Sequence, residues 1–241
     1  MEKMIEPKTS IDIRETGAEK NGSPQKSDRR LFCQLHVFTG VTNTELAAAA
    51  FQKSGLEGVV YLDVNDPFGI GILIFSEDPE TFTGQTRNFF TSAPFSAFRR
   101  RPEFTMIGRT YSSGREADLE DWLLLKPRRN ALNPELKWAV WYPLRRKPEF
   151  ALLSPTEQGK ILGEHALIGR SYGEAGLAHD IQLACYGIDQ NDNEFVLGIV
   201  SRELYPLSRL VQDMRKTQQT ANYIQSMGPF FVGKVVWQSR F

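Results

Sequence analysis

The sequence predicts an α+β fold made of two similar halves, each with the element order β-α-β-β-α-β. The same order of β-rich and amphipathic runs occurs twice, and the stretches Tyr61–Tyr111 and Tyr186–Trp237 have nearly equal length. Short segments also correspond: GIGILIFSED aligns with VLGIVSRE, and PEFTMIGRTY with GPFFVGKVVW. Because this order repeats a ferredoxin-like unit, we expect two antiparallel sheets that enclose a pocket, with helices outside. Two unrelated α+β domains are the alternative.

The N-terminal half spans residues 30–112. Runs rich in β-branched and aromatic residues predict its strands, and NDP predicts a turn between the two central ones. In chain order we expect a strand at 31–39, a helix from residue 42, strands at 58–64 and 68–76, a helix at 78–90 and a strand at 103–111.

The C-terminal half spans residues 137–241 and repeats this order. We expect a strand at 137–144, a helix from residue 154, strands at 179–188 and 194–201, a helix at 203–219 and a last strand at 229–237. The connecting segment, residues 113–136, is expected to contain a short helix.

The first 29 residues are polar and charged, which predicts a flexible tail. They contain no hydrophobic run typical of a secretory signal. No apolar run in the chain approaches the roughly 18 residues that a membrane span needs. We therefore expect a cytoplasmic protein without a membrane span.

The composition narrows the classes of function. The chain has 241 residues with 29 Lys+Arg and 29 Asp+Glu, so its formal net charge is zero. Nucleic-acid binding favours a basic excess, so we expect no nucleic-acid partner. Cys33 and Cys185 are the only two cysteines, too few for a disulfide framework or a cysteine-rich metal site. Their number is consistent with a reducing compartment.

The helix that begins near residue 154 has a well-defined start. Ser154 is a suitable N-cap, Pro155 suits the first helical position, and Glu157 completes a capping box. Gly169 and Arg170 suit its C-terminal end. Helical spacing places four residues on one face of it. These are Ile161, Leu162, His165 and Ile168.

His165 therefore points into the protein and has two interpretations. On spacing alone, a core histidine satisfied by hydrogen bonds is favoured. A neutral imidazole on an apolar helix face is also how proteins present an axial ligand to heme iron. Zinc is less well supported, because it needs three or four ligands. The other histidines and cysteines show no recognisable ligand spacing with His165.

Three segments together resemble the chlorite dismutase/HemQ family, which includes coproheme decarboxylases. They are WYPLRRKPEFALLSPTEQGKILGEHALIGRSY, GIDQNDNEFVLGIV and YIQSMGPFFVG, within residues 137–237; the first half matches weakly. The resemblance implies a dimeric α+β barrel formed by the two halves. It also implies an iron porphyrin (heme or coproheme) as cofactor, peroxide as oxidant, and a homo-oligomer, with a pentamer favoured.

The resemblance assigns roles to three residues of the C-terminal half. His165 matches the proximal ligand of the heme iron, and Tyr142 matches the tyrosine that coproheme decarboxylases oxidise to a radical. Arg146 stands where the family has a lysine near a propionate. Without the resemblance, Tyr142 is interpreted as a strand aromatic, and Arg146 as part of a solvated basic loop with its neighbours Arg145 and Lys147.

The chain departs from chlorite dismutases on the distal side. The position of their distal arginine corresponds to Asp180 or to Ala178, depending on the landmark used, and this argues against chlorite chemistry. Many coproheme decarboxylases have a glutamine there. Gln182 shares a strand face with Asp180, so either side chain is a candidate for the distal polar group.

The proximal side also departs from the family pattern. Chlorite dismutases have a glutamate that hydrogen-bonds the proximal histidine, and the matching position here is Val200. A ligand without a carboxylate partner donates less electron density. This favours a weaker peroxidase.

Three functions follow from these residues. The first is peroxide-dependent decarboxylation of coproheme propionates to give heme b, with Tyr142 as the catalytic residue. The second is a heme-binding or heme-sensing paralogue with weak peroxidase activity and no decarboxylase or chlorite dismutase activity. The third is a duplicated barrel that binds no heme, in which His165 is an ordinary core residue.

Overall fold

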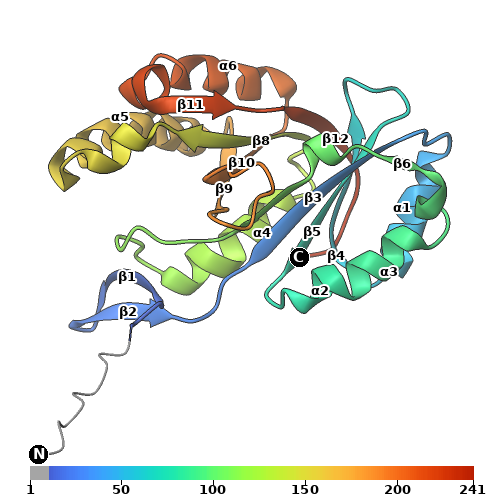
Figure 1. The fold of residues 1–241 in the computed structure, drawn as a ribbon, viewed down its shortest axis with the longest axis horizontal. Coiled ribbons are helices and arrows are strands. Elements are labelled where there is room, and N and C mark those ends of the chain that lie inside the picture. Colours follow the sequence, from blue (N-terminus) through green and yellow to red (C-terminus); the bar gives the residue numbers. More distant parts are fainter. Residues whose placement is uncertain (1–10) are drawn as a thin grey trace, which may run out of the picture.

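The computed structural model describes residues 11–241, in which one antiparallel sheet closes into an eight-stranded barrel (Figure 1). Its strands hydrogen-bond in a ring that returns to the first of them. In ring order they are β8 (Trp138–Arg146), β10 (Phe195–Ser201), β9 (His179–Ala184), β7 (Met106–Arg109), β3 (Phe32–Thr39), β5 (Ile70–Ser76), β4 (Glu57–Asp63) and β12 (Phe231–Gln238). Short strands β6 (Arg99–Arg100) and β11 (Ile224–Met227) pair with β3 and β8. The shortest strand pairing in the ring joins β7 and β9, where Arg109 and Ala184 form the single pair of residues.

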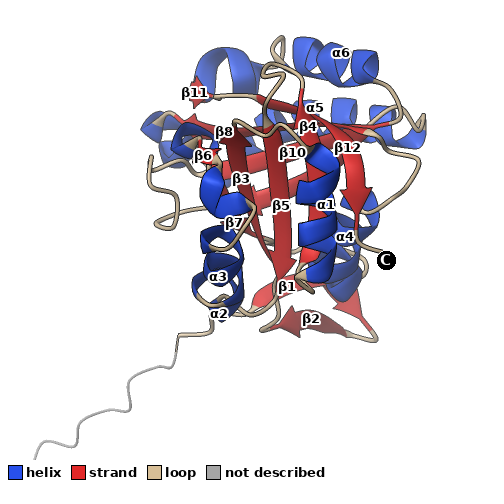
Figure 2. Cartoon of the chain, turned by 90° about the vertical axis from the view of Figure 1, so that its right-hand side faces the viewer, coloured by secondary structure: helices blue, strands red, loops and turns tan. Residues whose placement is uncertain are grey.

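Helices cover the outside of both halves of the barrel. Over the N-terminal half lie α1 (Thr44–Lys53), α2 (Glu80–Thr83) and α3 (Gln85–Thr91), in front of the strands in Figure 2. Over the C-terminal half lie α5 (Pro155–Glu174) and α6 (Leu204–Met214). The connecting segment forms a π-helix, Asp121–Leu125, that continues into α4 (Lys126–Ala131). Short 3₁₀-helices lie at Phe95–Ala97, Pro102–Phe104 and Pro148–Leu152, and a second π-helix lies at Gln219–Tyr223.

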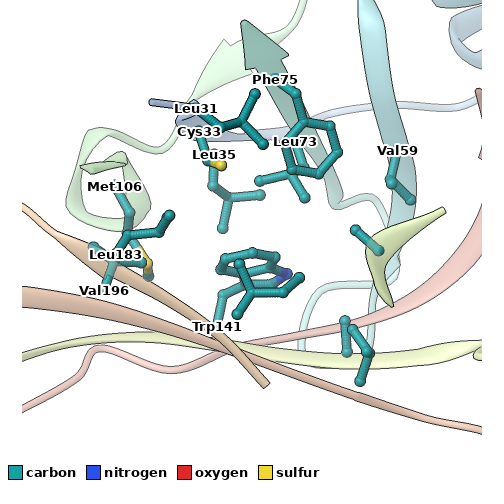
Figure 3. Close-up of a cluster of buried hydrophobic side chains, with 14 of the residues drawn as sticks. Leu31, Cys33, Leu35, Val59, Leu73, Phe75, Met106, Trp141, Leu183 and Val196 are labelled. Carbon is teal, nitrogen blue, oxygen red and sulfur yellow. The ribbon is translucent and has the colours of Figure 1, made fainter. Parts of the chain in front are cut away.

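The barrel interior forms the largest buried cluster. Trp141 of β8 is its largest fully buried side chain and faces Leu35 and Leu73 from the opposite strands (Figure 3). Gly198 of β10 makes room for it, because a Cβ there would stand 2.5 Å from the indole ring. Two further clusters lie between the sheet and its outer helices. Strand residues are therefore buried on both faces, as in a barrel covered by helices.

The predicted α+β fold is thus confirmed, and the two sheets are joined into one closed ring. No helix within residues 11–241 combines the length and apolar character needed to cross a membrane.

The predicted flexible tail is wrong for part of its length. Residues 1–10 lie outside the described residues, but β1 (Glu15–Lys20) and β2 (Ser23–Ser27) form a hairpin. The Gln25 side chain fastens this hairpin to the connecting segment: its amide donates to the Glu116 carbonyl at 3.2 Å, and its oxygen accepts from the Leu119 amide. Polar hydrogen bonds hold the hairpin, so hydropathy gives no signal for it.

His36 of β3 is a buried polar residue outside the C-terminal half. Neither ring nitrogen has a hydrogen-bond partner within residues 11–241, and the ring packs edge-on against Phe90 at 4.6 Å. Burial lowers the pKa of His36 to about 3. The folded protein therefore keeps this imidazole neutral, whereas the unfolded chain protonates it near pH 6.5.

Replacing His36 by leucine is expected to make the protein more resistant to acid. Between pH 6.5 and about 3 the unfolded state binds the extra proton, so wild-type stability falls as the pH falls. The loss is about 1.4 kcal/mol per pH unit at most. Urea unfolding at pH 7 and pH 4.5 measures it. The wild-type midpoint should fall more than that of His36→Leu, and equal shifts would contradict this origin of the acid sensitivity.

Candidate functional site

A row of side chains crosses the outer face of the C-terminal sheet, beneath α5. Tyr142 of β8 pairs with Leu197 of β10, and Leu197 pairs with Gln182 of β9. Asp180 lies two residues before Gln182, so it shares this face. The residues between them in sequence point into the barrel core. The prediction that Asp180 and Gln182 share a strand face therefore agrees with the observed register.

Helix α5 lies above this row and is loosely packed. Its capping box is present as expected, with Ser154 and Glu157 as partners. Only Ile161 among its twenty residues is buried, His165 is half-buried, and Leu162 is 37% exposed. The apolar face is thus narrower than predicted. The helix also ends later than expected, at Glu174, since Gly169 continues it.

A hydrogen bond sets the tautomer of His165. Its Nδ1 lies 3.4 Å from Oγ1 of Thr217, which is fully buried. The Thr217 hydroxyl proton goes to the carbonyl of Met214 at 2.8 Å, so towards His165 this oxygen can only accept. With the hydroxyl proton on that shorter bond, Nδ1 carries the hydrogen of the 3.4 Å contact and Nε2 keeps a lone pair. This is the form in which a histidine binds a metal.

The environment also keeps His165 neutral. Burial lowers its pKa, and the carboxylates of Glu164 and Asp180 raise it by a smaller amount. A neutral imidazole is a ligand, whereas an imidazolium is not.

The expected position of the proximal partner is wrong. Val200 is buried in the barrel interior, on the face of β10 opposite to Leu197, and so it points away from α5. Thr217 occupies the place beside His165 instead. Sequence reasoning missed Thr217 because it lies after α6, with no periodicity that relates it to α5.

Replacing Thr217 by valine is expected to let the His165 ring rotate, because the hydrogen bond from Nδ1 is lost. Valine keeps the shape of the threonine side chain. Hydrogen-bond partners of a metal-bound histidine contribute about 10- to 100-fold in affinity. The bond here is long and neutral, so we expect the lower value, about 10-fold weaker porphyrin binding, with an altered Soret band. Titration with ferric heme measures both. Thr217→Ser, which keeps the hydroxyl, is the control and should restore the wild-type spectrum; a valine variant with wild-type affinity would contradict the role.

Tyr142 lies on the sheet side of the site. It is 8% exposed, and its ring stacks on Phe230 with a centroid distance of 4.6 Å. Burial raises the pKa of Tyr142 to about 12, and the positive charge of Arg215 opposes that rise. The phenol is therefore protonated at neutral pH. Arg215, exposed just beyond α6, is a second residue that sequence reasoning missed.

Arg146 is already engaged within the protein. Its Nε donates to Glu194 at 2.9 Å, and its terminal nitrogen donates to the Tyr186 hydroxyl at 2.9 Å. The guanidinium also lies between the rings of Phe150 and Phe195, at 4.7 and 4.6 Å. It is therefore no solvated loop residue, and a ligand carboxylate would have to share it with Glu194.

The neighbours of Arg146 differ from it. Arg145 donates to the carbonyls of Asn191 and Asp192, whereas Lys147 is exposed. Ala178, the other position that matches the distal arginine, is buried immediately before β9. It offers no polar group.

Gln182 and Asp180 form one hydrogen-bonded group on β9. The Gln182 amide donates to the Asp180 carboxylate, and its oxygen accepts from the Tyr111 hydroxyl at 3.3 Å. Lys126 of α4 donates to the other carboxylate oxygen at 3.1 Å. The structure thus brings both candidates together and adds two partners, Tyr111 and Lys126, that sequence reasoning missed.

These residues suit an iron porphyrin. One histidine offers an Nε2 lone pair from the loosely packed α5, and the facing sheet offers apolar side chains beside Tyr142. Arg215 is a cation within electrostatic reach of Tyr142, as a propionate needs. A groove of about 440 Å³ opens between α5 and α6; Thr217 lines it, whereas His165 and Tyr142 do not. A single nitrogen ligand with apolar surroundings matches heme iron better than zinc.

Comparisons with known proteins give a partial match in sequence. The chain is 28% identical over 107 residues to the coproheme decarboxylase of Staphylococcus carnosus, covering 43% of this chain and 41% of that protein. It thus spans about two fifths of the length of that relative.

Solved structures share the fold at low identity. A protein provisionally assigned as a chlorite dismutase superposes with a TM-score of 0.70 at 15% identity, covering 87% of this chain and 96% of that one. A heme-binding protein from Thermus thermophilus superposes with a TM-score of 0.66 at 19% identity, covering 86% and 91%. The family model for chlorite dismutase matches residues 93–236, which is more than half of the sequence. The chain therefore belongs to the chlorite dismutase family.

Proposed function

We propose that the protein binds coproheme and converts it to heme b by peroxide-dependent oxidative decarboxylation of its propionates. The observation that carries this proposal is that α5, which carries His165, packs through Ile168 and Tyr172 on the sheet face that carries Tyr142. Similarity to a coproheme decarboxylase supports the substrate. The absence of an arginine at positions 178 and 180 argues against chlorite as the substrate.

Each residue has a distinct role in this proposal. His165 holds the iron through Nε2, and Thr217 orients it. The porphyrin iron, when bound, supplies the redox chemistry with peroxide. Tyr142 is the catalytic residue, a buried phenol that keeps its proton at neutral pH and gives it up only when oxidised. Arg215 and Arg146 are the cations for the propionates, and Gln182 with Asp180 supplies the distal polar group.

A second candidate is a heme-binding or heme-sensing protein with weak peroxidase activity. The neutral hydroxyl of Thr217 beside His165 favours it, because a hydroxyl makes the imidazole a weaker electron donor than a carboxylate would. In both cases we propose a homo-oligomer, with a pentamer favoured, that acts in the cytoplasm.

The test is to mix the purified protein with ferric coproheme, add peroxide slowly, and read the porphyrin products by mass. Stepwise loss of two carboxyl groups is the expected result. A Soret band with unconverted coproheme would select the second candidate. Without any bound pigment, His165 is a core histidine and the proposed function is wrong.

A further inference from the structure

The N-terminal hairpin of β1 and β2 lies at one end of the barrel (Figure 2), where β1 contacts the chain that leads from β7 into the connecting segment. The Ala18 amide donates to the Glu116 carbonyl at 3.0 Å, and the Thr16 amide donates to the Ser112 hydroxyl at 3.1 Å. Gly17 allows this close approach, because a Cβ there would stand 3.0 Å from the Glu116 carbonyl oxygen. β1 therefore lies between β2 and the connecting segment.

Glu15 of β1 extends this contact to the barrel itself. One oxygen of its carboxylate accepts from the Arg109 guanidinium at 2.9 Å, and the other accepts from the amide and the hydroxyl of Ser112 at 2.8 and 3.0 Å. The side chains of Glu15 and Arg109 are 14% and 35% exposed, so solvent screens this pair less than a fully exposed one. Arg109 is the β7 residue that forms the single pair with Ala184 of β9. The hairpin therefore binds the residue at which the ring closes.

The stretch that Glu15 holds also contacts the far side of the joint between β7 and β9. Tyr111 lies between the two residues that Glu15 binds, and its hydroxyl donates to the Gln182 side chain of β9 at 3.3 Å. The Tyr111 ring packs against Phe195 of β10, with a centroid distance of 5.6 Å. Glu15 therefore fixes the chain on both sides of a residue that spans the joint.

Polar contacts hold the hairpin in place, and hardly any of it is buried. Among the residues of β1 and β2, only Gly17 is buried. Besides Glu15, its main anchor is Gln25, whose amide donates to the Ala117 carbonyl at 3.1 Å and whose oxygen accepts from the Leu119 amide. A segment with few buried apolar contacts detaches at a lower free energy than the core unfolds. The hairpin can therefore leave its place while the barrel stays folded.

We propose that the N-terminal hairpin is a conformational switch for the ring: when docked it holds the β7–β9 joint closed, and when detached it lets the joint open. One pair of residues joins these strands, so contacts made from outside the ring contribute a large share of the stability of the joint. Glu15 is the positioning residue, because it acts on β9 through Arg109 and through the stretch that contains Tyr111. The inference concerns the closure of the barrel and does not depend on the proposed function.

Cys185 provides a reporter of the joint. It follows Ala184 directly, is fully buried, and donates its thiol hydrogen to the Asn193 carbonyl at 3.1 Å, so it reacts with a thiol reagent only when its surroundings open. The experiment labels the full chain with iodoacetamide under native conditions and follows each cysteine peptide by mass. Glu15→Gln keeps the size of the side chain and removes its charge. Because charged hydrogen bonds are lost, Cys185 should react at least about 10-fold faster.

A second variant tests whether the hairpin acts as a unit. Gln25→Ala removes the other anchor of the hairpin, on β2 and away from the Glu15 carboxylate. If detachment of the hairpin opens the joint, this variant should also make Cys185 react at least about fivefold faster. A rate that rises in Glu15→Gln but not in Gln25→Ala would reduce the effect to one ion pair and overturn the switch.

The matched control is Glu19→Gln, which makes the same change at an exposed position of β1 and should label within about twofold of wild type. Cys33 is an internal control, because it is buried in the same core on β3, which has a long pairing with β5. Its rate should stay at the wild-type value in every variant. Wild-type labelling of Cys185 in Glu15→Gln would overturn the proposal. An equal rise at Cys33 would overturn it as well, since the hairpin would then stabilise the whole barrel.

Discussion

Replacing His165 by alanine is expected to weaken the binding of ferric porphyrin by more than about 100-fold, because the only nitrogen that the proposed site offers to the iron is lost. Titration followed by the Soret band measures this affinity, and it also tests whether added imidazole can replace the lost side chain. The variant leaves a space the size of an imidazole beside Thr217, so added imidazole should restore the pigment band. The free energy of unfolding should change little, because His165 is only half-buried and its hydrogen bond is long.

The control for His165 is His36→Leu, which removes a more deeply buried histidine from the other half of the barrel. It should bind porphyrin as wild type does. Wild-type affinity in His165→Ala would contradict the ligand assignment and return this residue to the role of a core histidine.

Replacing Tyr142 by phenylalanine is expected to separate binding from conversion. The stacking on Phe230 needs only the ring, so porphyrin affinity should stay within about twofold and stability within about 0.5 kcal/mol. The hydroxyl is the group that gives up an electron and a proton in the proposed reaction. Conversion of coproheme should therefore slow by about 1,000-fold or more, which corresponds to about 4 kcal/mol in activation free energy.

Mass analysis of the porphyrin after a fixed number of peroxide additions measures the Tyr142 effect. Tyr205→Phe removes the hydroxyl of an exposed tyrosine on α6 and should convert coproheme at the wild-type rate. If Tyr142→Phe converts it equally fast, Tyr142 is a strand aromatic and the proposed mechanism is wrong.

The order of the elements could be predicted because local signals define it. Turn residues, strand-like runs and the capping box at Ser154 act within a few residues of one another. The closure of the ring could not be predicted in the same way. It depends on the pairing of β8 with β10 and of β7 with β9, which joins residues far apart in the sequence.

The errors in the site have a shared physical cause. Val200 lies on a strand whose two faces are both buried, so its apolar residues do not alternate with polar ones and the sequence does not reveal which way each side chain points. Thr217 and Lys126 reach the site from a loop and from the connecting helix. Their contribution depends on how separate elements pack, and hydrophobic periodicity carries no information about that.

The joint between β7 and β9 has a consequence for motion. A ring joined at one place by a single residue pair opens there at the lowest free energy, as a local fluctuation rather than as unfolding. Such breathing would release one edge of β9 while β10 holds the other. Backbone amides at this joint should therefore exchange with deuterium faster than those between β3 and β5, which share a long register.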